Sequence, residues 1–425
     1  MNPLQIWGRM RRYWKILGPG LVTGAADDDP SGIATYSQAG AGYGFQLLWL
    51  ALFTLPLMMV VQEMCARIGL VSGRGLAENI RRHYPRPVLY VCVGLLLVAN
   101  TFNIAADIGA MAKGVQLLVP ELSFPFLVSL FVILSISLEV FLSYETYAAY
   151  LKYLALVLLV YVVVGFSINL NWHAVFLHTV IPSITFSRDQ IFLICAILGT
   201  TISPYLFFWQ SSQEVEEDIK KGNVTLRSRE GATPLDIVDM RIDVWSGMSL
   251  SNIVMFFIIA VCGATLFTQG ITNIQTAAEA ASALRPIAGE WAYLLFALGM
   301  IGTGLLSVPV LAGSSAYALA ETFQWREGLS RKPRQAYGFY GVVVFSMLVA
   351  LILNFVGIDP IKALIYAAVG NGIVAPVMLF LIVRLSDRND VMGKWKNSRV
   401  IATLGWLLVG CMSIASVATI ASLFL

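Results

Sequence analysis

Long apolar segments recur along the whole of this 425-residue chain, and they limit the folds open to it more than any other feature. A helix needs roughly 20 mostly apolar residues to cross the hydrocarbon core of a bilayer. Hydrophobic residues make up 58% of the chain and charged residues only 12%, whereas soluble domains carry about 25% charged residues. The sequence therefore predicts an all-α integral membrane protein.

Eleven segments have the length and hydropathy expected of membrane spans. They lie near residues 16–43, 47–66, 88–118, 125–142, 149–170, 190–213, 246–268, 291–318, 337–356, 361–384 and 400–422. No nucleophile–base arrangement and no phosphate loop accompanies them, and the five cysteines are scattered singly. We therefore expect no enzymatic activity, no cofactor and no nucleic-acid partner.

The distribution of Lys and Arg predicts how the spans are oriented. With the N-terminus in the cytoplasm, 24 of the 28 Lys and Arg residues fall on inner segments. Because inner loops of membrane proteins carry the excess of positive charge, we expect a multi-pass protein of the plasma (inner) membrane with a cytoplasmic N-terminus and an outer C-terminus. The mixed-charge stretch 213–241 is expected to be a solvated cytoplasmic loop.

Two of the spans are interrupted by helix-breaking residues. The first contains GAADDDPSGIA at residues 24–34, and the sixth contains LGTTISPYLFF at residues 198–208. Proline removes a backbone donor and glycine lets the chain leave the helix. An unwound backbone at membrane depth is tolerated only where it faces protein or a water-filled cavity. We therefore predict that helices 1 and 6 are unwound near the middle of the membrane.

The positions of the breaks predict an internal repeat. They lie five helices apart, as expected for two five-helix repeats of inverted topology, which in transporters place the substrate site at the two broken helices. We assign the first repeat to about residues 16–170, the second to about 190–384, and an extra helix to about 400–422.

The residues at the two breaks predict an oxygen-rich site. Asp29 and Asp28 supply carboxylates, and Thr200, Thr201 and Ser203 supply hydroxyls. Hard cations such as Mg²⁺ prefer oxygen ligands, and Mg²⁺ keeps several of its waters, whereas thiolate, thioether and imidazole ligands favour softer metals. No Met, Cys or His lies in either break. Oxygen chemistry alone also permits Na⁺, and a helix N-terminus permits an anion.

These stretches resemble the NRAMP family of metal-ion transporters. GPGLVTGAADDDPSGIATYSQAGA resembles the family's first helix, whose motif is Asp-Pro-Gly-Asn, and ILGTTISPYLFFWQSS resembles the sixth, with Gly-Ala-x-x-Met-Pro-His. The second span and DRNDVMG after the tenth add to a resemblance that covers nearly the whole chain. It implies the LeuT-type fold, in which two inverted five-helix repeats and an eleventh helix move by alternating access.

The chain departs from the family's pattern at the positions that bind metal. Asp29 keeps the Asp of the first motif, but Ser31 replaces its Gly and Gly32 replaces its metal-binding Asn. In the sixth helix Thr200 replaces the Ala whose carbonyl binds metal, and Ser203 replaces the Met whose sulfur selects transition metals.

Residues of the family's proton pathway are replaced as well. Tyr205 stands where the family has His, and in ANTFNIAADIG of the third span Asn103 and Ala106 stand for the usual Asp and Glu. Ala368 falls where a Gln often assists the metal. The resemblance thus implies metal contacts at Asp29, Asp28, Gly32, Thr200 and Ser203, and pathway positions at Ser31, Thr201, Tyr205, Asn103 and Ala368.

These departures are most similar to the NRAMP-related magnesium transporters, a divergent branch that moves hydrated Mg²⁺ and Mn²⁺ without proton coupling. We accordingly expect transport of a divalent cation, Mg²⁺ first and Mn²⁺ second, by a monomer in the lipid bilayer. Three alternatives stay open: a proton-coupled Mn²⁺ or Fe²⁺ importer, a transporter of another ion such as bicarbonate with or without Na⁺, and a sensor that does not transport.

Overall fold

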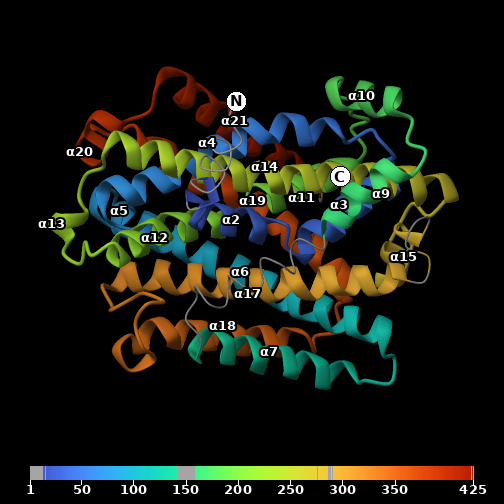
Figure 1. Cartoon of the computed structure of the whole chain (residues 1–425), viewed down its shortest axis with the longest axis horizontal. Helices are drawn as coiled ribbons and strands as arrows, with labels where there is room; N and C mark the ends of the chain where they lie inside the picture. The colour runs from blue at the N-terminus through green and yellow to red at the C-terminus, as the bar shows by residue number, and fades with distance from the viewer. Residues whose placement is uncertain are drawn as a thin grey trace, which may run out of the picture.

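The structure is a computed structural model, and it describes residues 13–14, 16–141, 158–274, 276–285, 289, 291–422 and 424. All regular secondary structure in these ranges is helical, as predicted (Figure 1). The basic residues Arg9, Arg11, Arg12, Lys15 and Lys152 and the start of the fifth predicted span lie outside the described residues.

Most of the predicted spans are single long helices. They are α4 (Trp49–Ser72), α6 (Arg86–Leu118), α7 (Phe124–Phe141), α14 (Pro234–Thr265), α17 (Trp291–Phe323), α18 (Tyr337–Leu353), α19 (Pro360–Ser386) and α21 (Arg399–Ser422). The shorter helices are α2 (Pro19–Asp27), α3 (Pro30–Tyr43), α5 (Leu76–His83), α9 (Leu159–Ser167), α10 (Trp172–Val180), α11 (Arg188–Thr201), α12 (Pro204–Lys220), α13 (Leu226–Arg229), α15 (Ala277–Ser282) and α20 (Asn389–Met392). Turns of 3₁₀-helix lie at Phe267–Gln269, Pro333–Gln335 and Gly393–Trp395.

Eight helical segments in the described ranges are long and apolar enough to cross a membrane. The other three predicted spans differ in form. The first is divided into α2 and α3, the fifth is described only from Leu158 onward, and the ninth is α18, with 17 residues. The multi-pass architecture is confirmed, whereas the count of eleven helices and the limits of the two repeats stay predictions.

Both predicted breaks are present, and they have the same local design. α2 ends at Asp27 and α3 begins at Pro30, with Asp29 as its N-cap residue. α11 ends at Thr201 and α12 begins at Pro204, with Ser203 in the N-cap position. Proline fits the first helical position because the N–H group it lacks would have no partner there. The second half of each broken helix therefore starts at an X-Pro pair.

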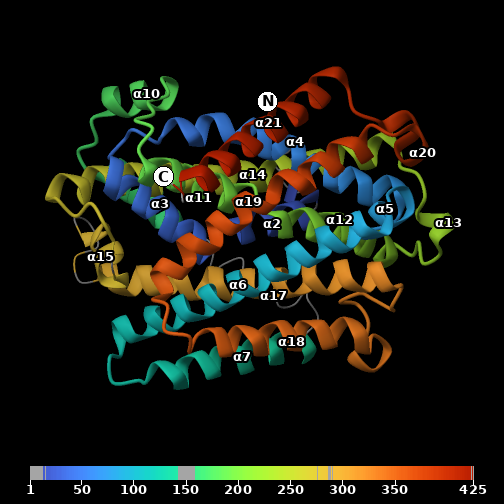
Figure 2. The ribbon, with the colours of Figure 1, turned by 180° about the vertical axis from the view of Figure 1, so that it is seen from behind.

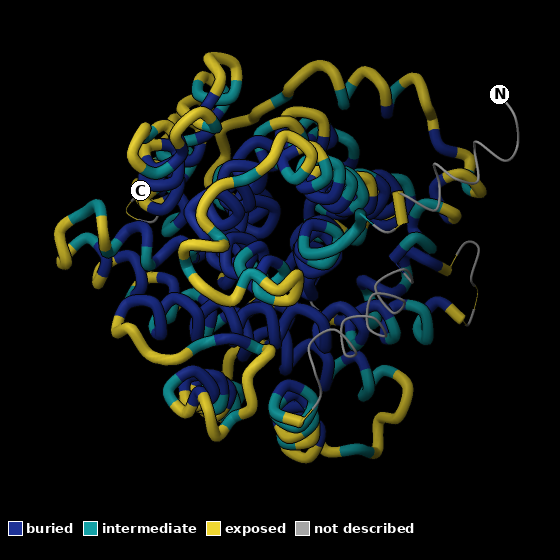
Figure 3. Tube along the Cα trace, turned by 60° about the vertical axis from the view of Figure 1, so that its left-hand side comes forward, coloured by how far each residue is buried: buried dark blue, intermediate teal, exposed yellow. Residues whose placement is uncertain are grey.

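The broken helices occupy the centre of a bundle whose helices run along the long axis of the molecule (Figures 1 and 2). They pack against α4, α14, α19 and the pair formed by α6 and α17. Helices α7 and α18 form the edge beyond α6 and α17. The central segments are buried, while exposed positions follow the outer faces and loops (Figure 3).

The charged connections gather at one end of the bundle. Helices α5, α13 and α20, which belong to segments predicted to lie inside, are found at the same end, and α10 and α15 are found at the other (Figure 1). This arrangement agrees with the charge pattern of the sequence, while the identity of the cytoplasmic end stays a prediction.

Helix α2 lies directly against α14, with almost no side chain between the two backbones. A Cβ atom at Gly24 would overlap the backbone of Gly247, and one at Gly247 would overlap the backbone of Gly20. Small residues allow membrane helices to approach closely, so that van der Waals packing holds them together. Glycine is therefore required on both sides of this contact.

A carboxylate on α14 fixes the start of α2 as well. Asp243 accepts hydrogen bonds from the backbone N–H groups of Gly18 at 2.8 Å, Gly20 at 2.6 Å and Leu21 at 3.0 Å. The first N–H groups of a helix have no partner within the helix, and the positive end of its dipole favours a negative charge. Asp243 thus satisfies three of these donors from a neighbouring helix.

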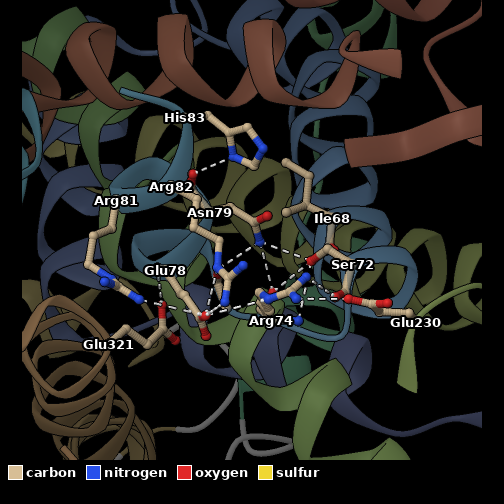
Figure 4. A network of polar contacts seen from close by, with 11 residues as sticks. Ile68, Ser72, Arg74, Glu78, Asn79, Arg81, Arg82, His83, Glu230 and Glu321 are labelled. Carbon is tan, nitrogen blue, oxygen red and sulfur yellow. Dashed lines mark hydrogen bonds and ion pairs between the residues drawn. The ribbon is translucent and has the colours of Figure 1, made fainter. Parts of the chain in front are cut away.

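Polar contacts also join α4, α5, α12 and α17 at the end of the bundle where α5 lies (Figure 4). Glu321 accepts hydrogen bonds from the backbone N–H of Glu78 and from Ser212 Oγ, each at 2.9 Å. Nearby, Arg74 Nη2 lies 2.8 Å from Glu230 Oε1. These contacts hold the connection between α4 and α6 against the rest of the bundle.

The stretch 213–241 is only partly the solvated loop that the sequence predicted. Helix α12 continues to Lys220, and α14 already begins at Pro234. The acidic residues of the last turns of α12 are largely buried, and Tyr317 OH donates to Glu216 Oε1 at 3.1 Å. The prediction was wrong here because neighbouring helices, and not water, surround these charged side chains.

The glycine contact between α2 and α14 makes a specific prediction. We expect Gly24→Val to force the two backbones apart and to lower the free energy of unfolding by about 1–3 kcal/mol, the usual cost of overpacking. Thermal unfolding of the purified protein in detergent measures the change. Gly94→Val on α6 is the matched control, because no heavy atom lies within 4 Å of a Cβ atom at that position. Equal effects of the two changes would contradict the close contact.

Candidate functional site

Asp29 lies at the break between α2 and α3, where it is only 1% exposed. Its Oδ1 accepts hydrogen bonds from the backbone N–H of Gly32 at 2.8 Å and from Ser31 Oγ at 2.6 Å. Its Oδ2 accepts one from Asn103 Nδ2 of α6 at 3.0 Å. Asp29 is therefore both the N-cap of α3 and a buried carboxylate held by three donors.

The two broken helices meet beside Asp29 through hydroxyl groups. Ser31 Oγ lies 3.0 Å from Thr200 Oγ1, which belongs to the last turn of α11. A Cβ atom at Gly32 would lie 3.5 Å from Thr200 Oγ1 and 3.5 Å from the carbonyl oxygen of Asp27. Five residues predicted from the sequence are thus brought together around the first break: Asp29, Ser31, Gly32, Thr200 and Asn103.

The other two aspartates of the break face α14. Ser251 Oγ lies 2.6 Å from Asp27 Oδ2 and 3.2 Å from Asp28 Oδ1. Asp27 Oδ1 has no hydrogen-bond partner in the described part of the chain. Asp28 also lines a cavity of about 790 Å³ between α2 and α14, whose walls are mostly apolar. Asp28, predicted to share a site with Asp29, therefore lies on a different side of the break.

Two hydroxyls of the sixth span are directed elsewhere. Thr201 Oγ1 lies 2.9 Å from Tyr36 OH of α3 and 3.7 Å from Met255 Sδ of α14. Ser203 Oγ donates to two carbonyl oxygens of the last turns of α11, at 2.8 Å each. Ser203 thus closes the end of α11.

The last two predicted pathway residues have structural partners. Tyr205 OH donates to the carbonyl oxygen of Ala26 at 2.8 Å, which joins the start of α12 to the end of α2. Ala368 lies where α19 and α11 touch, since a Cβ atom at Gly199 would overlap its carbonyl oxygen. Ala368 thus lies in helix packing and is not among the partners of Asp29.

Three polar residues near the breaks were not predicted from the sequence. Asp243 and Ser251 of α14 hold α2 at its start and at its end. Asp107 of α6 is fully buried one turn beyond Asn103 and accepts a hydrogen bond from Ser307 Oγ at 2.7 Å. Of the three, only Asp107 could have been predicted from the sequence, because an acidic residue inside a membrane span is a functional-site hypothesis by default.

The ends of the broken helices shape the electrostatics of the site. α2 and α11 end at the breaks, and each directs carbonyl groups and the negative end of its dipole toward them. α3 and α12 begin there, but the carboxylate of Asp29 already caps the positive end of α3. The partners of the three aspartates among the described residues are hydroxyl, amide and backbone N–H groups. This arrangement suits a cation better than an anion.

The sequences of known proteins match nearly the whole chain. Residues 20–422 match the family model Nramp, described as natural resistance-associated macrophage protein-like. The chain is 28% identical over 407 residues to the divalent metal cation transporter MntH of Klebsiella pneumoniae, covering 93% of this chain and 91% of that protein. It is 27% identical over 410 residues to MntH of Deinococcus radiodurans, covering 94% and 88%.

Solved structures confirm the fold. The Eremococcus coleocola manganese transporter, in complex with an aromatic bis-isothiourea substituted compound, has a TM-score of 0.73 at 18% identity, covering 96% of this chain and 88% of that chain. Mhp1, a nucleobase-cation-symport-1 family transporter, has a TM-score of 0.57 at 16% identity, covering 96% and 91%. The predicted LeuT-type fold is therefore confirmed, and the match over residues 20–422 shows that the chain belongs to the Nramp family.

Proposed function

We propose that this protein transports a divalent metal cation across the membrane, Mg²⁺ first and Mn²⁺ second, with part of its water shell and without proton coupling. Membership of the Nramp family supports the class of substrate, since the relatives are named divalent metal cation transporters and a solved relative is named a manganese transporter. The choice of Mg²⁺ rests on the residues around Asp29.

The observation that carries the proposal is the set of groups around Asp29, in which the atoms able to bind a cation are oxygens. Its neighbours are the hydroxyls of Ser31 and Thr200, the amide of Asn103 and the backbone at Gly32. Carboxylate, hydroxyl and carbonyl oxygens are the ligands that Mg²⁺ and Ca²⁺ prefer, whereas sulfur and imidazole favour transition metals. A site of this composition gives Mn²⁺ no advantage from a soft ligand.

A thioether does lie near the second break, but not beside Asp29. Met255 Sδ is 3.7 Å from Thr201 Oγ1, on the face of α11 that meets Tyr36. Ser203 stands at the position where the resemblance implies the selective sulfur. That sulfur thus belongs to the packing of α14 against the broken helix, and a second one, Met111 Sδ of α6, packs against Gly304 near Pro30.

The small number of charged ligands favours a cation that keeps water. The described residues contain no group of three or more His, Cys, Asp or Glu side chains that could hold a metal ion. Mg²⁺ dehydrates reluctantly and is usually bound through one or two carboxylates with several waters retained.

The proposed lack of proton coupling rests on two side chains. Asn103, which donates to Asp29, carries no titratable group, and Tyr205 donates its hydroxyl to a backbone carbonyl. A tyrosine has an ordinary pKa of about 10 and stays neutral near pH 7. Neither residue is suited to take up and release a proton during a transport cycle.

Alternating access between the two repeats completes the proposal, with the α5 end of the bundle as the cytoplasmic side. Asp28 and Asp29 are 4% and 1% exposed, so both carboxylates are buried in this structure. Release then requires α2 to move, and its attachments to α14 include the glycine contact and the Asp243 cap. Transport of bicarbonate is less well supported, because three aspartates lie at the break and none of their hydrogen-bond partners among the described residues is cationic.

The proposal predicts Mg²⁺ uptake without movement of protons. Purified protein in proteoliposomes should take up Mg²⁺ and Mn²⁺, while a trapped pH-sensitive dye reports no acidification that depends on the protein. Bicarbonate and Ca²⁺ are measured in parallel. Mn²⁺ uptake that acidifies the vesicles and excludes Mg²⁺ would establish the proton-coupled importer in its place.

Asp29 should be essential because its carboxylate is bonded to Ser31, which contacts the second broken helix, and to Asn103 of α6. We expect Asp29→Ala to reduce uptake of both cations to the background of empty vesicles, with a normal elution profile in detergent. Asp359→Ala, at the exposed start of α19, is the control, and it should retain uptake. Full uptake by Asp29→Ala would show that Asp29 is not a ligand.

Ser203→Met should add a soft ligand at the break. We expect the ratio of Mn²⁺ to Mg²⁺ uptake to rise on the order of 10-fold, which corresponds to about 1.4 kcal/mol of relative binding free energy. Ser203→Ala separates the gain of sulfur from the loss of the hydroxyl and should leave the ratio near that of the unaltered protein. An unchanged ratio in Ser203→Met would show that this position does not select the ion.

A further inference from the structure

A second carboxylate lies close to Asp29, and the proposed function does not use it. Asp107 of α6 is completely buried, and Ser307 Oγ of α17 donates to its Oδ2 at 2.7 Å. Its other oxygen, Oδ1, has no hydrogen-bond partner within the described ranges. An acidic side chain inside a membrane span is costly unless it is paired, so Asp107 requires an explanation.

Helix α6 places Asp107 next to the broken helix. Asp107 lies four residues after Asn103, and side chains at this spacing occupy the same face of a helix about 5–6 Å apart. Asn103 is the residue that donates to Asp29. Asp29 and Asp107 are both acidic, and like charges repel each other when both are ionised.

Helix α17 also contacts the start of α3. A Cβ atom at Gly304 would lie 3.3 Å from Pro30 Cγ, so the start of α3 touches α17 one turn from Ser307. Met111, the next residue along this face of α6, packs against Gly304 as well. Asp107 and Ser307 therefore lie near the start of α3, the helix that Asp29 caps.

Two buried oxygen atoms in this region have no hydrogen-bond partner among the described residues. Besides Asp107 Oδ1, the amide oxygen Oδ1 of Asn103 has no partner among the described residues, although Asn103 is fully buried. Buried polar atoms almost always find a hydrogen-bond partner, a water or an ion. Two unpartnered oxygens on adjacent turns, next to a hydroxyl, form the ligand set that a hard, partly hydrated cation takes.

We propose that Asp107, with Ser307 and the amide oxygen of Asn103, forms a second binding station for the divalent cation, adjoining Asp29 on the side where α3 begins. A cation at this station neutralises the repulsion between the two carboxylates and passes to Asp29 with its inner waters in place. The inference goes beyond the proposed function by adding a site, and it rests on that function only in taking the transported ion to be a divalent cation.

The test compares Asp107→Asn with the unaltered protein by two measurements. The first is the cation concentration that gives half-maximal uptake into proteoliposomes, and the second is the dissociation constant of Mn²⁺ from calorimetry in detergent. Asn keeps the shape of the side chain and removes its charge. We expect both quantities to rise about 10- to 100-fold, the usual cost of losing a group that supports a metal site. Asp107→Glu should recover part of the loss, because it restores the charge.

Glu139→Gln provides the matched control. Glu139 is also a buried carboxylate without hydrogen-bond partners among the described residues, but it lies on α7, at the edge of the bundle beyond α6 (Figure 2). Removal of this charge should leave both measured quantities unchanged. If Asp107→Asn is recovered in too small an amount to assay, Ser307→Ala tests the same station and should raise both quantities in the same direction.

The outcomes separate this inference from the proposed function. If the unaltered protein carries Mn²⁺ and not Mg²⁺, the choice of Mg²⁺ in the proposed function fails. Asp107→Asn is then compared with the unaltered protein by Mn²⁺ uptake and Mn²⁺ binding alone. Values for Asp107→Asn within twofold of the unaltered protein overturn the second station. The second station is also overturned if Asp107→Asn leaves cation binding unchanged and only removes a dependence of uptake on pH, because Asp107 would then carry a proton.

Discussion

The buried carboxylate of Asp29 is the constraint on which the rest of this structure depends. A charged group in a membrane span is costly unless polar groups surround it. Here a helix is broken so that Asp29 can cap α3, and α6 supplies an amide to its second oxygen. The break exposes backbone groups in turn, and these are tolerated only because the break is buried among other helices. The arrangement of the bundle follows from that need.

Close helix contacts hold the two breaks in place. On one side α2 meets α14 through Gly24 and Gly247, and on the other α11 meets α19 through Gly199. Because these backbones touch, small rotations of one helix are resisted by its neighbour, and the oxygens at the breaks keep their positions. The attachments of α2 differ from the others in one respect, since its start is held by a side chain, Asp243, that can release it.

The sequence predicted the elements of this site better than their orientations. Pro30, Gly32 and Pro204 mark the breaks because their backbone properties act locally, whatever surrounds them. The directions of Asp28 and Ala368 depend on how each helix is turned against its neighbours, which no local pattern specifies.

Two other differences have the same origin. The acidic end of α12 was predicted to be solvated because its composition is that of a loop, yet α17 covers it. Asp107 was not predicted because the family resemblance points to the replaced positions Asn103 and Ala106, although Asp107 is the remaining acid of that span. In both cases the contact that decides the outcome joins residues about 100 or more positions apart.

The central claim is that oxygen ligands at the break bind a cation that keeps part of its water. Electron–nuclear double resonance on bound Mn²⁺ tests it most directly, because the spectrum reports which nuclei surround the metal. We expect proton couplings from several bound waters and no coupling from nitrogen. A Mn²⁺ ion without bound water, or one held by nitrogen ligands, would contradict it.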